Sequence, residues 1–206
     1  MERLSRLGIF GGTFDPPHLG HLILATEALD QLKLEQVFWV LTPDPPHKPD
    51  QPRQSVDDRL AMLHILISDF PQFALSRVDI DRPPPIYAVD SVRLLAQEHP
   101  QAELVYLIGG DSLRDLPTWH DPVGLLHAAA ALGVMRRPDD GVDLVILEER
   151  LPGLGAKIQC IDAPLLEISS SEIRRRIHAG RPFRHYLPVG VYFLIRERQL
   201  YGYKNG

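Results

Sequence analysis

The chain has 206 residues, of which 44% are hydrophobic, with a formal net charge of −5 and a pI near 6.0. This length supports one substantial hydrophobic core, so we predict a single domain spanning residues 1–206. The acidic balance and the scattered basic residues argue against a protein that coats nucleic acid by charge alone, and we expect no nucleic-acid partner.

Cysteine content and hydropathy bear on the compartment. Cys160 is the only cysteine in the sequence. It can form neither an internal disulfide nor a site built from several thiolates, which favours a reducing, cytoplasmic setting. No apolar run approaches the roughly 18 residues that a membrane helix requires, and the first ten residues lack the apolar region of a signal peptide. We therefore expect a soluble protein without a membrane partner.

The predicted elements alternate along the chain. Apolar, strand-like runs occupy residues 7–10, 36–41, 73–80, 103–109, 130–135, 142–147 and 157–161. Helical periodicity occupies residues 21–32, 55–68, 87–99, 121–130 and 170–180. This alternation predicts an α/β fold, an open parallel sheet with helices on both faces. Ligands of such sheets bind beyond the carboxyl ends of the strands, so the loops there are the candidate site.

The loop after the first strand, "GGTFDPPHLGH" at residues 11–21, has the composition of a phosphate site. Glycines let backbone amides approach a ligand closely, and the following helix N-terminus favours an anion. His18 and His21 are three residues apart near this helix start, so both rings can face one ligand. The loop is neither a Walker P-loop nor a dinucleotide fingerprint. A capping role for the histidines is an alternative, whereas zinc would need further ligands, and we expect no resident metal.

A second candidate loop, "ISSSEIRRR" at residues 168–176, precedes the last predicted helix. Ser169 and Glu172 fit a capping box, which explains both ends of this motif. The capping box does not explain the remaining serines and arginines. Ser170 and Arg174 stand near the helix start, where a hydroxyl and a guanidinium could hold a polyphosphate. Arg175 and Arg176 point to other faces, and we expect both to be solvated.

Together, "GGTFDPPHLGH" and "ISSSEIR" resemble the signatures of the nucleotidyltransferase superfamily with the His-x-Gly-His motif. The further motifs "PPHK", "DRLAML", "IGGDSL", "PTWH" and "LPVGVYFLIRERQLYG" are similar to those of bacterial nicotinate mononucleotide adenylyltransferases, in the same order and over nearly the whole chain. The resemblance implies a Rossmann-like fold of the nucleotidyltransferase type. It also implies transfer of AMP from ATP to nicotinate mononucleotide with Mg²⁺, giving nicotinate adenine dinucleotide and pyrophosphate in NAD biosynthesis.

The same resemblance implies roles for individual residues. Catalytic roles fall to His18, His21, Lys48 and Arg174. Contacts to ATP fall to Gly11, Gly12, Thr13, Phe14, Asp111 and Ser170. Tyr87, Ala88 and Trp119 would bind nicotinate mononucleotide, with Trp119 stacking on the pyridine ring. Asp15 is expected to shape the loop or to bind a metal-bound water, and His47 is interpreted as a loop residue.

One position departs from the family pattern. Family members usually carry Tyr-Thr where this chain has Tyr87 and Ala88. Ala88 keeps its N–H but lacks the hydroxyl, and the three prolines at 83–85 have no N–H to donate, so backbone donors begin at Ile86. Two alternatives therefore stay open: an enzyme with relaxed or nicotinamide mononucleotide specificity, and a non-catalytic nucleotide-sensing homologue. A homo-oligomer is also left open by the sequence.

Overall fold

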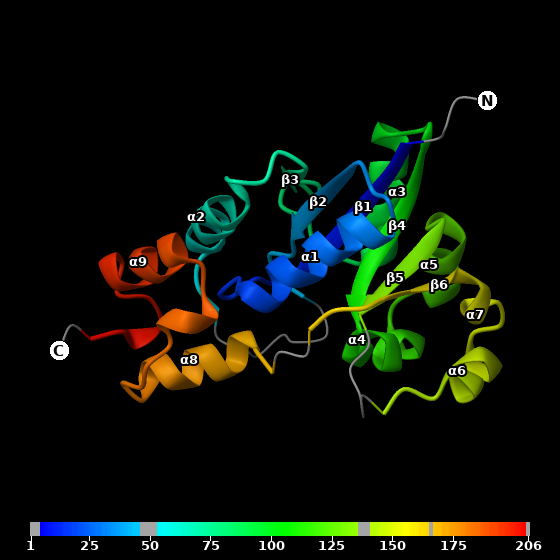
Figure 1. Cartoon of the computed structure of the whole chain (residues 1–206). Coiled ribbons are helices and arrows are strands. Elements are labelled where there is room, and N and C mark those ends of the chain that lie inside the picture. The colour runs from blue at the N-terminus through cyan, green and yellow to red at the C-terminus, as the bar shows by residue number, and fades with distance from the viewer. Residues whose placement is uncertain (1–4, 46–52, 136–140, 165–166, 205–206) are drawn as a thin grey trace.

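The computed structural model of the chain describes residues 5–45, 53–135, 141–164 and 167–204. Within these residues, six strands form one parallel sheet in the order β3-β2-β1-β4-β5-β6 (Figure 1). The strands are β1 (Ser5–Gly12), β2 (Gln36–Leu41), β3 (Phe73–Ser76), β4 (Ala102–Gly109), β5 (Ala131–Met135) and β6 (Ile158–Ile161). The predicted open parallel sheet is confirmed, and its strand order reverses between β1 and β4.

Helices cover both faces of this sheet, as the alternation predicts. Alternate residues of β1 face opposite sides, so Phe10 joins one hydrophobic cluster and Ile9 the other. The first cluster packs under α1 (Leu19–Gln31), α2 (Val56–Ile67), α8 (Ser170–His178) and α9 (Val189–Glu197). The second packs under α3 (Ala88–Glu98), α4 (Gly110–Asp115), α5 (Pro122–Ala128), α6 (Leu144–Arg150) and α7 (Leu154–Lys157). Each face of the sheet therefore has its own buried core.

Side-chain caps fix where several of these helices begin. Ser55 Oγ accepts the Asp58 N–H at the start of α2, and Asp121 Oδ1 accepts the Gly124 N–H at the start of α5. Ser169 Oγ accepts the Glu172 N–H at the start of α8. The Ser169 half of the predicted capping box is therefore present. The Glu172 carboxylate, which would form the other half, pairs instead with the arginines that follow it along α8.

The strand predicted at residues 142–147 is wrong. Helix α6 occupies most of this stretch because Asp143 Oδ1 accepts the N–H groups of Val145 and Ile146 and so caps a helix. The apolar run that suggested a buried strand is largely exposed, with Val145 at 71% relative accessibility. The local cap therefore decides the structure where no sheet neighbour covers the side chains.

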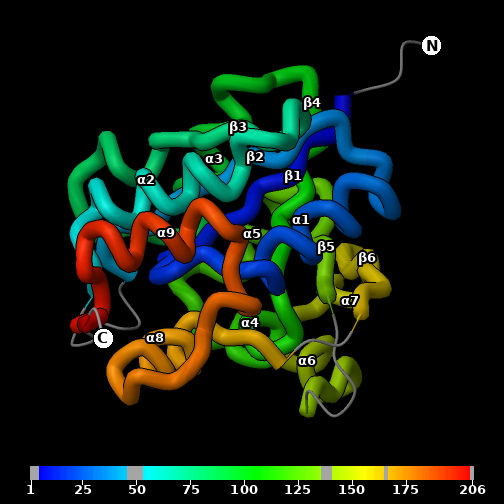
Figure 2. The backbone as a smooth tube through the Cα atoms, turned by 60° about the vertical axis from the view of Figure 1, so that its left-hand side comes forward, coloured from blue at the N-terminus to red at the C-terminus, as the bar shows by residue number. Residues whose placement is uncertain are grey.

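The C-terminal part of the chain returns to the first face of the sheet. Helix α9 packs against α2, and the two lie side by side in both backbone views (Figure 2). The described residues also contain the 3-10 turns η1 (Leu116–Thr118), which follows α4, and η2 (Arg184–Tyr186) and η3 (Leu200–Gly202), which flank α9. Among the residues the structure describes, no helix is long and apolar enough to cross a membrane.

Candidate active site

The candidate loops meet at the point where the strand order reverses. β1 ends at Gly12 and its neighbour β4 ends at Gly109, at the same edge of the sheet. The segment between β1 and α1 and the segment after β4 therefore leave the sheet next to each other. In doubly wound sheets this crevice is the position where nucleotides bind.

The glycines that end β1 leave no room for a side chain. A Cβ on Gly11 would lie 2.9 Å from Tyr106 Oη, and a Cβ on Gly12 would lie 3.0 Å from the Phe14 ring. Glycine at both positions therefore lets Tyr106 and Phe14 pack close to the end of the strand, and it adds no side chain beside the loop backbone. Thr13 follows directly and is half-buried.

Phe14 adopts a left-handed backbone conformation with φ of 47°. Its ring is 1% exposed and packs in the core against Phe10 and Trp39. The ring edge also contacts His21, with 5.2 Å between ring centroids. The backbone of Phe14 is therefore the part placed to contact a ligand, while its buried ring packs against the His21 ring.

His18 and His21 stand together at the start of α1. His18 is the N-cap residue, and its backbone N–H donates to His21 Nδ1 at 3.1 Å. Their rings are stacked, with centroids 3.6 Å apart and planes 22° apart. Because Nδ1 of His21 accepts a hydrogen bond, its proton is assigned to Nε2. Burial, and then charge on His18, hold the pKa of His21 well below its ordinary value, so His21 is a neutral donor at pH 7.

The N-terminus of α8 docks on the same loop. Ser170 Oγ donates to the Pro16 carbonyl at 2.9 Å, and Arg174 Nη1 donates to the Asp15 carbonyl at 2.7 Å. The structure thus brings these two predicted residues, distant in sequence, to within a few residues of His18. Their hydrogen bonds fix the loop backbone.

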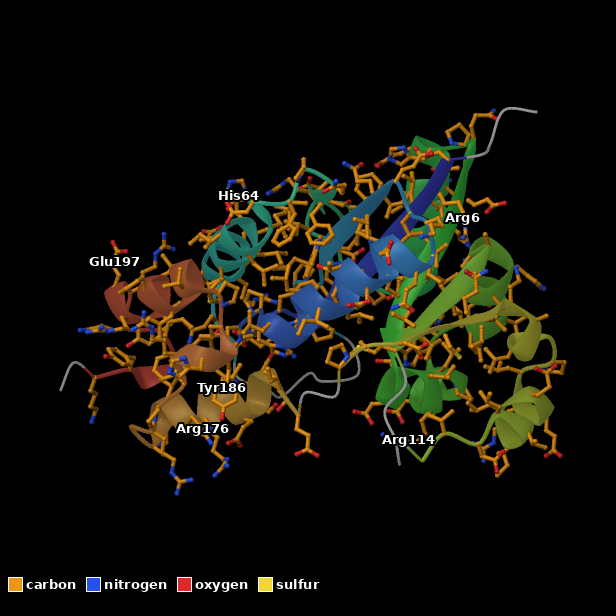
Figure 3. The ribbon with its side chains drawn as sticks, viewed as in Figure 1. Arg6, His64, Arg114, Arg176, Tyr186 and Glu197 are labelled. Atoms are coloured by element: carbon orange, nitrogen blue, oxygen red, sulfur yellow. The ribbon has the colours of Figure 1, made fainter. Side chains whose placement is uncertain are left out.

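Arg175 and Arg176 point away from the loop, as predicted, but the expected solvation holds for Arg175 and is wrong for Arg176. Both pair with Glu172, at 2.6 and 3.0 Å. The Arg176 guanidinium also lies over the Tyr186 ring, 5.0 Å from its centroid, on the outer side of α8 (Figure 3). The Arg175 side chain is mostly exposed, whereas that of Arg176 is 26% exposed.

Arg59 of α2 is a central residue of the site that the sequence reasoning did not assign. It is 2% exposed, and its guanidinium donates to four backbone carbonyls, those of Gln54, Thr13, Thr42 and Pro43, at 2.8–3.1 Å. It therefore ties the loop after β1 to the loop after β2. The available signal was a charged residue in register with the apolar face of the predicted helix, three and four positions before Met62 and Leu63.

The residues expected to bind the mononucleotide also converge. The Tyr87 ring stacks on His120, with centroids 3.9 Å apart, which places it beside Trp119. The half-buried Trp119 packs edge-on against Tyr106, the residue whose hydroxyl lies next to Gly11. Ala88 is the first residue of α3, and among the described residues the N-cap Tyr87 makes no side-chain hydrogen bond to this helix start. Its N–H is thus one of the free donors of a helix N-terminus.

A buried polar cluster holds the segment before α3. Asp79 is 3% exposed and accepts hydrogen bonds from Ser91 at 2.6 Å and from Arg82 at 3.0 Å. Arg82 also donates to the Tyr87 carbonyl at 3.0 Å. Burial raises the pKa of Asp79, and the bonds from Ser91 and Arg82 act in the opposite direction. This cluster fixes the backbone that carries Tyr87 and Ala88.

Two further predicted residues lie differently. Asp111 is in the first turn of α4, where it is exposed and paired with Arg114 at 3.3 Å. The N-cap of α4 is Gly109, so Asp111 lies inside the first turn and does not cap this helix. Lys48 and its neighbour His47 lie outside the described residues. Within the described part of the chain, no three His, Cys, Asp or Glu side chains gather where they could hold a metal ion.

Comparison with known proteins bears on this arrangement. The family model described as cytidylyltransferase-like matches residues 9–176. A probable nicotinate-nucleotide adenylyltransferase of Thermomicrobium roseum is 46% identical over 96% of this chain and 92% of the relative. One from Synechococcus sp. (strain JA-3-3Ab) is 41% identical over 95% and 94%. The solved structure of Plasmodium falciparum nicotinic acid mononucleotide adenylyltransferase complexed with NaAD has a TM-score of 0.81 at 19% identity, covering 97% of this chain and 98% of that one, which shows the shared fold.

Proposed function

Because the chain belongs to the nicotinate-nucleotide adenylyltransferases, a cytidylyltransferase-like family, we propose that the crevice between β1 and β4 performs that reaction. The enzyme transfers AMP from ATP to nicotinate mononucleotide and releases nicotinate adenine dinucleotide and pyrophosphate. The observation that carries the assignment of the site is the stacked pair His18 and His21 at the start of α1, next to the bare glycine end of β1.

The reaction needs no nucleophile from the protein. The mononucleotide phosphate is already an oxyanion at neutral pH, and it attacks the α-phosphorus of ATP as the bond to pyrophosphate breaks. The protein must bring two anions into line and stabilise the charge that grows on the leaving group. Fixed hydrogen-bond donors with little freedom to reorganise serve this purpose.

The loop after β1 supplies such donors in this proposal. The Nε2–H of His21 and the ring of His18 face the ATP phosphates, and the N-terminus of α1 adds positive potential. Gly11, Gly12 and the backbone of Phe14 permit close approach of the phosphates, with Thr13 adding its hydroxyl. Ser170 and Arg174 hold the loop in place, and the cationic Arg174 adds charge at the triphosphate. Lys48 would add a point charge from the loop after β2.

The divalent cation that adenylyl transfer from ATP requires is proposed to be Mg²⁺. The carboxylate nearest the histidines along the chain, Asp15, is buried and hydrogen-bonded to Tyr201. The described residues gather no set of three metal ligands. This arrangement fits a cation that enters the site bound to the ATP phosphates and keeps much of its hydration shell, as Mg²⁺ usually does. When bound, it would neutralise charge on the departing pyrophosphate.

The mononucleotide is proposed to bind on the β4 side. Trp119 would stack on the pyridine ring. Asp111, in the first turn of α4, would accept hydrogen bonds from the ribose hydroxyls of ATP. The nicotinate carboxylate would be met by N–H donors at the start of α3, including that of Ala88. A helix N-terminus favours a carboxylate over a neutral amide, so selection for the acid does not need the missing threonine hydroxyl.

The test is a product assay with two acceptors. Purified protein is incubated with ATP and Mg²⁺ and with either nicotinate or nicotinamide mononucleotide, while dinucleotide and pyrophosphate are measured. We expect strong preference for the acid. Equal rates with both acceptors would contradict the role assigned to the α3 N-terminus, and the absence of product from both would favour a nucleotide sensor.

A further inference from the structure

The C-terminal turn η3 contacts the loop that carries the histidines. Tyr201 Oη donates to Asp15 Oδ1 at 2.6 Å, across 186 positions of sequence. Asp15 stands three residues before His18, and its backbone carbonyl is the group that Arg174 binds. One residue of the loop is thus held by α8 through its backbone and by η3 through its side chain.

In the described part of the chain, the hydrogen bond that the Asp15 carboxylate accepts comes from Tyr201. Asp15 is 2% exposed, and Oδ2 has no hydrogen-bond partner in the described part of the chain. A buried carboxylate without hydrogen bonds is strongly disfavoured, so the bond from Tyr201 carries unusual weight. The guanidinium of Arg59 adds attraction from the α2 side, but its hydrogen bonds within the described residues go to backbone carbonyls.

The backbone at and just before η3 adopts a costly conformation beside this contact. Tyr201 has φ of 58° and Gln199 has φ of 51°, in the left-handed region that side chains disfavour. The buried Leu200 between them anchors the turn in the core. Burial and the charge of Asp15 raise the pKa of Tyr201 far above its ordinary value, so its hydroxyl stays a donor throughout any assay range.

From these contacts we propose that Tyr201 is a positioning residue for adenylyl transfer, acting through Asp15 to fix the loop that presents His18 and His21. The inference rests on the proposed function of that loop. It assigns to the C-terminal segment a part in turnover, beyond its packing against α8.

The test compares Tyr201→Phe, Asp15→Asn and the double variant with the matched control Tyr203→Phe. Tyr203 lies two residues further along, where its ring packs on Phe183 and faces Arg196. We expect Tyr201→Phe to lower kcat roughly tenfold or more, because the variant loses the free energy of a hydrogen bond to a charged group. KM for both substrates should change much less, and Tyr203→Phe should match the wild type.

Coupling identifies the route of the effect. If Tyr201 acts through Asp15, the double variant should lose no more kcat than the more impaired single variant, whereas additive losses would overturn the proposal. A lowered melting temperature of Tyr201→Phe with unchanged kcat would also overturn the proposal, because the contact would then contribute to the stability of the fold and not to turnover.

A second readout separates this proposal from the proposed function. The ring signals of His18 and His21 in heteronuclear NMR spectra should shift in Tyr201→Phe and not in Tyr203→Phe. This comparison needs no turnover, so it tests the positioning even if the wild-type protein gave no product. Unchanged ring signals in Tyr201→Phe would contradict the inference.

Discussion

Replacing Arg59 by methionine removes the guanidinium that joins the two loops beside the candidate site. The side chain is 2% exposed, and its three nitrogens donate to four carbonyl oxygens at 2.8–3.1 Å. Methionine fills part of the same space but can donate to none of these oxygens. The perturbation therefore isolates the polar function of Arg59 from much of its packing.

The expected cost follows from those four acceptors. A carbonyl that loses its donor in a buried place costs about 1–3 kcal/mol. The residues that carry the four carbonyls are only partly buried, so water can reach some of them and the lower end of that range applies. We expect the free energy of unfolding to fall by about 3–5 kcal/mol, which corresponds to a melting temperature lower by roughly 6–20 °C in a chain of this size.

The matched control is Arg198→Met. Arg198 also reaches the first turn of α2, where it pairs with Asp58 at 2.8 Å, but its side chain is 45% exposed. Exposed ion pairs contribute at most about 1 kcal/mol. Urea and thermal unfolding of both variants measure the difference directly. Equal, small losses in the two variants would refute the view that Arg59 holds the loops together.

Three further predictions concern the site. Gly11→Ala should reduce stability and turnover, since its Cβ would meet Tyr106 Oη at 2.9 Å, whereas Gly109→Ala, with nothing within 4 Å, should melt like the wild type. The lowered pKa of His21 means that its imidazole takes up a proton more readily in the unfolded chain than in the folded one. The free energy of unfolding should therefore fall as pH drops below 6.5. Urea titrations at several pH values should show this dependence, and His21→Gln should weaken it. Trp119→Ala should raise KM for nicotinate mononucleotide by at least about tenfold with little change in KM for ATP, in steady-state kinetics; a rise for ATP alone would exclude the stacking role.

The parts of the fold that were predictable are those with regular local patterns. The six-residue run at β2 is a buried parallel strand in both the prediction and the structure, and α2 begins where Ser55 suggested. The exposed apolar residues of α6 misled the prediction because periodicity cannot tell whether a sheet neighbour is present. The Asp143 side chain, which caps the helix, is the local feature that favours α6 there.

The candidate site divides in the same way. His18 and His21 could be singled out from the sequence because both stand at a helix start, where a spacing of three residues brings their rings together. Arg59 and Tyr201 could not be given roles, because each acts on the loop from a distant segment through a contact that only the tertiary structure creates. The family resemblance implies a contact between Phe14 and ATP, yet the ring of Phe14 belongs to the core.

The most direct test of the central claim measures adenylyl transfer by His18→Ala in a single turnover, with bound ATP and saturating nicotinate mononucleotide. The control is His64→Ala, which removes an exposed imidazole from the outer side of α2 (Figure 3). We predict that His18→Ala keeps its melting temperature within a few degrees and loses turnover by about 10²–10³, the worth of one fixed donor to developing charge. Turnover within twofold of the wild type would contradict the account, because the histidine pair would then have no part in the transfer.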